Sequence, residues 1–227
     1  MATELILIRH GNAVRVNGHY VSAPLTPLGQ RQADATGRYF CRAHEHFDGF
    51  YCSPLRRARE TAARIGLGTG QLPHVRNGLQ ELNGLEVPQL VLCESLARVG
   101  VFGHYLYETS GRPLTWPIIG RVSTILTRLI EEHPDQRVTV VAHSGVISAV
   151  LAWYFPGRRR HWWRYTVDNC SLTRLRIDGA KAQALAINDT NHLKPEITTT
   201  QPPEPAVELA NAATARIAPT AAGPLKR

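Results

Sequence analysis

The 227-residue sequence lacks several features that would place it in a membrane or a secreted protein. It has no apolar run of about eighteen or more residues, so we expect no membrane span. Its N-terminus, MATELILIRH, carries a glutamate before the apolar run and no small-residue cleavage site, unlike a signal peptide. Its four cysteines include no C-x-x-C pair. These absences predict a cytoplasmic protein with reduced, buried thiols.

Acidic residues are fewer than basic ones. The sequence has 18 Asp and Glu against 26 Lys and Arg, a net charge of +8. Residues 195–227 hold three of each sign, so the excess lies in residues 1–194. This balance favours an anionic partner, which can be a phosphate ester, a nucleic acid or an acidic surface.

A metal-binding pattern is also missing. The sequence has no H-x-x-x-H motif and no carboxylate triad to accompany His10, His19, His44, His46 and His143. We therefore expect an activity that needs no metal and no other cofactor.

Strand-like and helix-like segments alternate along residues 1–194. Strands are predicted at 3–8, 47–54, 74–82, 137–143, 170–178 and 181–189, and helices at 26–44, 55–66, 116–133 and 145–155. This alternation predicts an α/β protein, a three-layer α/β/α sandwich with a mostly parallel central sheet. Residues 195–227, with six prolines and no clear period, are predicted to be a flexible tail.

Two predicted strands end in a histidine. His10 follows LILIR and His143 follows VTVVA. In open α/β sheets, ligands bind beyond the carboxyl ends of the strands, so neighbouring strands would bring both imidazoles to one crevice. Arg9 adds a planar cation suited to phosphate, and Gly11 allows close approach of the backbone to a bound group. These residues predict an anion site.

Several motifs together resemble the histidine phosphatase superfamily, in its branch 1 or phosphoglycerate-mutase-like form. They are LIRHGNA, PLTPLGQRQA, SPLRRARETA, LQEL and VVAHSGVI, in that order, with DNCSLTRL and INDTNHL as closing strands. The resemblance covers residues 4 to about 193. It implies a phosphoglycerate-mutase-like fold for a domain spanning residues 1–194.

The resemblance also implies catalytic roles. His10 would be the nucleophile that carries the phosphoryl group, while Arg9, Arg57 and His143 would surround the phosphoryl oxygens. Glu81 would be the general acid that protonates the leaving group and later activates water.

Further residues are expected to contact the substrate. They are Gly11, Asn12, Thr26 and Ser144, although helix capping explains Thr26 equally well. Glu86 is an alternative to Glu81 as the acid.

The sequence departs from the mutase pattern in two places. Leu82 follows the acid where mutases have an arginine, and Ser148 stands where the family often has another arginine. Losing these cations favours a cofactor-independent phosphomonoesterase acting on a small phosphorylated metabolite. A phosphoglycerate-type mutase and a non-catalytic phosphate-ligand binding module remain alternatives.

Other partners are not expected. The basic and aromatic segment PGRRRHWWRY could suit a nucleic acid. The resemblance instead places a packed, tryptophan-bearing segment there, so we expect neither a nucleic acid nor a membrane partner. Both a monomer and a homodimer remain open, and the segment between Glu81 and Trp116 is expected to cover the leaving group.

Overall fold

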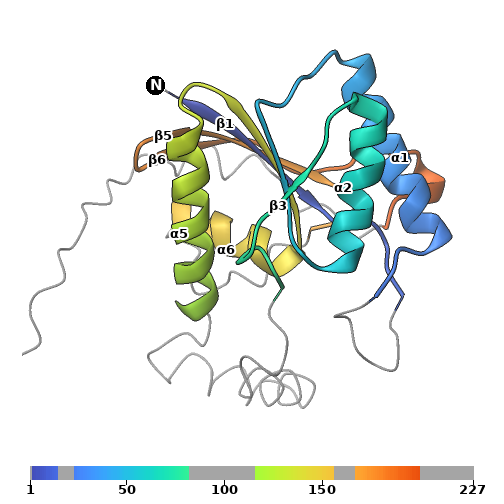
Figure 1. Cartoon of the computed structure of the whole chain (residues 1–227), viewed down its shortest axis with the longest axis horizontal. Coiled ribbons are helices and arrows are strands. Elements are labelled where there is room, and N and C mark those ends of the chain that lie inside the picture. Colours follow the sequence, from blue (N-terminus) through green and yellow to red (C-terminus); the bar gives the residue numbers. More distant parts are fainter. Residues whose placement is uncertain (1, 15–22, 82–115, 156–166, 200–227) are drawn as a thin grey trace, which may run out of the picture.

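A six-stranded sheet lies between two pairs of helices (Figure 1). The computed structural model describes residues 2–14, 23–81, 116–155 and 167–199. The sheet order is β3–β2–β4–β1–β5–β6. The strands are β1 (Thr3–Arg9), β2 (Gly49–Cys52), β3 (His74–Val75), β4 (Arg137–Ala142), β5 (Leu172–Asp178) and β6 (Lys181–Asp189). The helices are α1 (Pro27–Arg42), α2 (Arg56–Thr69), α5 (Trp116–Glu132), α6 (Ser144–Tyr154) and the short 3₁₀ helix η2 (Pro195–Ile197).

Strand β1 shows how the sheet is covered on both faces. Its side chains alternate, as in any strand. Leu5 and Leu7 are buried with residues of α5 and α6, whereas Ile6 and Ile8 are buried with residues of α2 and with Phe40 of α1. The predicted three-layer α/β/α arrangement is therefore confirmed.

The sheet is parallel at its centre and antiparallel at one side. β1 and β2 both run parallel to β4, and β3 runs parallel to β2. β5 runs antiparallel to β1, and β6 antiparallel to β5. The predicted mostly parallel sheet thus has a two-stranded antiparallel edge made by the last two strands.

Both helices on the α1 side have clear terminal signals. Thr26 caps α1 by accepting a hydrogen bond from the Gly29 amide at 3.0 Å, and Pro27 fits the first turn. The predicted end of the second helix at Gly66 is wrong, because α2 continues to Thr69 and ends at Gly70. Gly70 adopts the left-handed conformation, with φ of 73°, that terminates helices. Gly66 instead provides close packing, since a Cβ there would overlap the Gln71 carbonyl.

Two further sequence predictions need correction. Only His74 and Val75 of the predicted strand 74–82 join the sheet, since Gly78 turns the backbone with φ of 93°. The described cysteines Cys52 and Cys170 are buried thiols as predicted, but Cys41 is exposed on α1.

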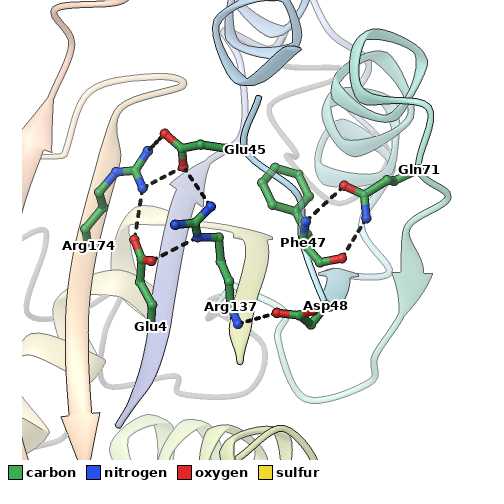
Figure 2. Close-up of polar contacts among 7 residues, drawn as sticks. All are labelled: Glu4, Glu45, Phe47, Asp48, Gln71, Arg137 and Arg174. Atoms are coloured by element: carbon green, nitrogen blue, oxygen red, sulfur yellow. Dashed lines mark hydrogen bonds and ion pairs between the residues drawn. The ribbon is translucent and has the colours of Figure 1, made fainter. Parts of the chain in front are cut away.

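An ion-pair network lies where β1 and β4 begin (Figure 2). Arg137 Nε lies 2.9 Å from Glu4 Oε2, and Arg174 Nη1 lies 3.0 Å from Glu4 Oε1. Arg174 also donates two hydrogen bonds of 2.9 Å to Glu45. The Arg137 backbone amide donates to Asp48 Oδ2 at 2.7 Å. These contacts tie β1, β4, β5 and the segment after α1 together.

None of the helices in the described ranges is long and apolar enough to cross a bilayer.

The first residues of the predicted tail are part of the fold. Residues 195–199, which the sequence assigns to the tail, contact the folded unit through a hydrogen bond from Gln32 to the Ile197 carbonyl. Residues 200–227 lie outside the described residues, and their flexibility stays a prediction.

Candidate active site

The register of the sheet brings His10 and His143 together. β1 and β4 are parallel neighbours, and Arg9 pairs with Ala142. The next residue of each strand is a histidine, so both imidazoles emerge side by side at the carboxyl ends of the strands. Their ring centroids are 5.1 Å apart. The two histidines thus lie side by side, as expected for neighbouring strands, and their shared role as one site stays a prediction.

His10 is held in one tautomer by its two ring contacts. Nδ1 lies 2.7 Å from the Gly11 carbonyl oxygen, which can only accept, so Nδ1 carries the proton. Nε2 accepts a hydrogen bond of 3.0 Å from Arg57 Nε and therefore carries the lone pair. Burial, followed by the charges of Arg57 and Arg9, lowers the pKa of His10 to about 3. The imidazole is neutral at physiological pH.

Arg57 is the arginine of α2 that faces the site. Its side chain is 3 % exposed, whereas Arg56 and Arg59 are exposed. Arg56 forms an ion pair with Glu60 at 2.6 Å, one turn along the helix. The sequence-based choice of Arg57 among the three arginines agrees with this geometry.

His143 lies fully buried as the N-cap residue of α6. Its Nε2 is 2.8 Å from the Ser53 hydroxyl at the end of β2. Its pKa is held well below the usual value, chiefly by burial and then by His10, Arg57, Arg9 and Arg121. Within the described part of the chain, its Nδ1 is buried without a hydrogen-bond partner. A buried imidazole nitrogen of this kind suits an oxygen atom of a ligand.

Glu81 reaches the same helix end. Its Oε2 accepts a hydrogen bond of 3.2 Å from the Gly145 amide, in the first turn of α6. This bond fixes the position of the Glu81 carboxyl group at the start of α6. A Cβ at position 145 would overlap the Glu81 carboxyl group and displace it from this place. His143 and Glu81 are thus placed by one turn of backbone.

Arg9 and Arg121 complete the positive charge. The Arg9 guanidinium donates to the Val167 carbonyl. Arg121 of α5 donates to the Gln80 carbonyl at 2.7 Å, directly before Glu81, and its charge contributes to the lowered pKa of His143. Sequence reasoning missed Arg121, because only tertiary packing brings α5 beside β4. The sequence feature that could have identified it is the position of this arginine between two core residues, Ile119 and Val122.

Comparisons with known proteins agree with this arrangement. The family model described as the histidine phosphatase superfamily, branch 1, matches residues 5–190. The chain belongs to this superfamily. This histidine phosphatase is 25 % identical over 203 residues to phosphoserine phosphatase 1 of Hydrogenobacter thermophilus, covering 84 % of this chain and 94 % of that protein. It is also 25 % identical over 207 residues to the adenosylcobalamin/α-ribazole phosphatase of Salmonella typhimurium, covering 85 % and 100 %.

A solved structure supports the fold. The histidine phosphatase aligns with a phosphoserine phosphatase mutant from Entamoeba histolytica, solved in complex with phosphoserine, with a TM-score of 0.65 and 19 % identity. The alignment covers 85 % of this chain and 100 % of the other. At this identity the likeness establishes the fold, which is the predicted phosphoglycerate-mutase-like one.

The residues after His10 contact the protein itself. The Gly11 amide donates to the Thr61 hydroxyl at 3.0 Å, and the Asn12 amide donates to Gln32 Oε1 at 2.8 Å. A Cβ on Gly11 would lie 2.6 Å from the Gly29 carbonyl oxygen. The close approach that Gly11 was predicted to allow is therefore to helix α1, and both amides are engaged by side chains.

The remaining predicted binding residues differ in their surroundings. Thr26 caps α1 and also donates to Asn12 Oδ1 at 2.8 Å, so the structure gives it the capping role left open by the sequence. This bond orients the Asn12 amide. Ser144 begins α6 beside His143 with a half-buried side chain. Contacts of Asn12 and Ser144 with substrate stay predictions.

Some predicted features of the histidine phosphatase lie outside the described residues. They are Glu86, His19, the segment between Glu81 and Trp116, and the whole of the basic and aromatic segment 156–165. Among the described residues, no group of three or more His, Cys, Asp or Glu side chains is gathered as a metal site would require.

Proposed function

We propose that this enzyme hydrolyses the phosphomonoester of a small metabolite through a phosphohistidine on His10. The observation that carries this proposal is the pair of contacts on His10. Its Nδ1 proton binds the Gly11 carbonyl, and its Nε2 lone pair faces Arg57. A neutral imidazole with Nε2 held beside a guanidinium is ready to attack phosphorus, since the phosphate brings its anionic oxygens to the same cation.

The first step transfers the phosphoryl group. The Nε2 lone pair forms a bond to phosphorus as the ester P–O bond breaks. Arg57 then donates to a phosphoryl oxygen instead of to Nε2. Arg9, Arg57 and His143 surround the site where charge spreads over the three equatorial oxygens, and such preorganised donors supply most of the rate in phosphoryl transfer. The buried Nδ1 of His143 supports its assignment to an oxygen ligand.

Glu81 handles the protons of both steps. It protonates the leaving alkoxide when the P–O bond breaks. In the second step it takes a proton from water, the water oxygen bonds to phosphorus, and the P–N bond breaks to return the electron pair to Nε2. Its hydrogen bond from the Gly145 amide places the carboxyl group at the first turn of α6, next to His143, which supports this role. Arg121, bonded to the preceding carbonyl, holds the acid-bearing residue in place.

Hydrolysis is favoured over transfer to a second hydroxyl. Leu82 stands where a mutase would have an arginine, and Ser148, which is buried within α6, stands where the family often has another. The substrate is expected to be small and phosphorylated, as the names of the relatives imply for those proteins. We further expect a reaction without metal or other cofactor, because arginines and histidines supply the positive charge.

The test is phosphate release from a panel that includes phosphoserine, sugar phosphates and glycerol phosphate. We expect wild-type protein to release free phosphate, also after exhaustive chelation, and His10→Ala to lose turnover completely. Rapid quenching should trap an acid-labile, base-stable phosphoenzyme in wild type and not in His10→Ala. A His10→Ala rate within about tenfold of wild type, roughly 1.4 kcal/mol of barrier, would contradict the proposal. Transfer of phosphate to a second hydroxyl without release would identify a mutase.

A further inference from the structure

The segment 195–199 lies against the loop that carries His10, and one buried amide joins the two. Gln32 of α1 is fully buried. Its Oε1 accepts a hydrogen bond of 2.8 Å from the Asn12 amide, and its Nε2 donates one of 2.7 Å to the Ile197 carbonyl. The same side chain therefore contacts the catalytic loop and the C-terminal segment.

A second buried amide makes the same connection from the other side. Asn169, which is 6 % exposed, donates from Nδ2 to the His10 carbonyl at 2.8 Å. Its backbone amide donates to the Thr199 hydroxyl at 3.1 Å. The Thr199 hydroxyl in turn lies 3.4 Å from Asn169 Oδ1, to which it donates. Since Oδ1 is occupied by this donor, the amino group of Asn169 is directed at His10.

Apolar packing keeps the segment in place. Ile197 packs against the small buried cluster of Ala33, Cys170 and Leu193. Cys170 also donates its backbone amide to the Arg9 carbonyl at 2.9 Å. The segment, the loop before β5 and the end of β1 are thus packed as one unit.

We propose that residues 195–199 form a brace that positions His10 for attack, with Thr199 and Gln32 as positioning residues. This inference rests on the proposed function, in which Nε2 of His10 must be aligned with phosphorus. Through Asn169 and Gln32, the brace is linked to the backbone on both sides of the imidazole, at the His10 carbonyl and the Asn12 amide. A small displacement of an attacking atom costs rate far more than it costs binding, because alignment matters most in the transition state.

The test removes one hydroxyl from the full-length chain. Thr199→Val keeps the size and branching of the side chain but cannot donate to Asn169 Oδ1. We expect kcat to fall by about tenfold, the factor that one neutral hydrogen bond can contribute, with little change in KM. Thr199→Ser restores the hydroxyl and should restore kcat. The matched control is Thr198→Val, because the Thr198 hydroxyl is exposed and bonds only locally, to the Lys194 carbonyl at 3.0 Å.

A second measurement does not depend on activity. Hydrogen exchange of the backbone amides in residues 9–13 should accelerate by about tenfold in Thr199→Val and not in Thr198→Val, because local opening no longer has to break the two bonds between Thr199 and Asn169. If wild type hydrolyses none of the panel, the proposed function fails while exchange still tests the brace. If Thr199→Val has the same kcat and the same hydrogen-exchange rates as wild type, the proposed brace is wrong. Equal losses in both valine variants would also overturn it.

Discussion

The two ends of the central strands hold their charges in different ways. Where β1 and β4 begin, Arg137 and Arg174 are bonded to the carboxylates of Glu4 and Glu45 (Figure 2). Where the same strands end, Arg57 bonds to the imidazole of His10, and Arg9 bonds to a backbone carbonyl. Burial first, and then the charges of the arginines at this end, lower the pKa of both histidines, so the arginines make the field there positive.

This difference suggests that the charges at the amino ends of β1 and β4 stabilise the fold and those at the carboxyl ends attract a ligand. Charges matched by opposite charges within the fold stabilise it and present little net field to a ligand. Arginines that lie beside buried imidazoles attract an anion to the same place and keep those histidines unprotonated. The excess of basic residues seen in the sequence is thus useful at the carboxyl end of β1 and β4, and the amino end can be changed without altering the chemistry.

The largest effects are expected at the carboxyl end. Glu81→Gln should slow the phosphorylation step with alkyl phosphates by about 10²–10⁴-fold more than with nitrophenyl phosphate, because nitrophenolate leaves without a proton. Arg57→Ala should slow both substrates alike, since the phosphoryl oxygens are common to both. The burst of nitrophenolate should be compared with alkyl phosphate turnover.

The burst matters because Glu81 is also the expected base for the second step. If dephosphorylation limits nitrophenyl phosphate turnover, the steady-state rate of Glu81→Gln falls for both substrates, whether or not Glu81 is the acid in the first step. Equal slowing of both leaving groups in the burst would mean that Glu81 is not the acid. Glu86 would then be the next residue to change.

An intermediate effect on stability alone is expected at the amino end. Glu45 is 16 % exposed and bonds both arginines of the network, so Glu45→Gln should lower the free energy of unfolding by about 2 kcal/mol. The matched control is Glu132→Gln, because Glu132 and its partner Arg76 are 53 % and 45 % exposed. That change should cost less than about 0.5 kcal/mol.

Chemical denaturation measures this contrast, and kcat should not change in either variant. A tenfold loss of kcat in Glu45→Gln would remove the distinction between the two ends. Equal stability losses in Glu45→Gln and Glu132→Gln would show that the network contributes no more than an exposed pair.

The smallest expected effect is on the stability of the fold at acidic pH. Burial lowers the pKa of His192 from 6.5 to about 4, and its Nε2 lies 3.0 Å from the Thr36 hydroxyl, away from the candidate site. Between these pH values the unfolded chain binds more protons than the folded one, so the free energy of unfolding falls as pH falls. His192→Gln should flatten this dependence by up to about 1.4 kcal/mol per pH unit.

Melting temperatures at pH 4.5 to 7 would record this slope. The exposed His46→Gln is the control that should leave the curve in place. A His192→Gln curve with the wild-type slope would show that His192 does not stay neutral in the folded protein over this range.

Local sequence signals predicted much of the fold. The aliphatic run of β1, the Thr26-Pro27 start of α1 and the apolar run into His143 each mark an element that the structure contains. The two histidines were placed by the rule that ligands bind at the carboxyl ends of parallel strands. The chosen arginine of α2 followed from helical geometry together with the family pattern.

What the sequence could not provide depends on contacts between distant residues. Arg121 reaches Gln80 across 41 positions, Ser53 reaches His143 across 90, and Asn169 reaches His10 across 159. No local period marks such pairs. The predicted end of α2 is wrong for a related reason. Gly66 allows the helix to pack against the Gln71 carbonyl, whereas Gly70 terminates the helix. Composition alone does not distinguish these two roles of glycine.

The separation of the two imidazoles has a simple origin in the backbone. Neighbouring strands lie about 4.8 Å apart, and the ring centroids of His10 and His143 are 5.1 Å apart. The interatomic spacing of the candidate site is thus inherited from the repeat of the sheet itself. Divergence of the core side chains leaves that repeat unchanged, whereas a one-residue slip between β1 and β4 would move one histidine to the opposite face. An engineer can therefore change core side chains that contact neither histidine, provided that the pairing of Arg9 with Ala142 and the residues bonded to the two histidines are kept.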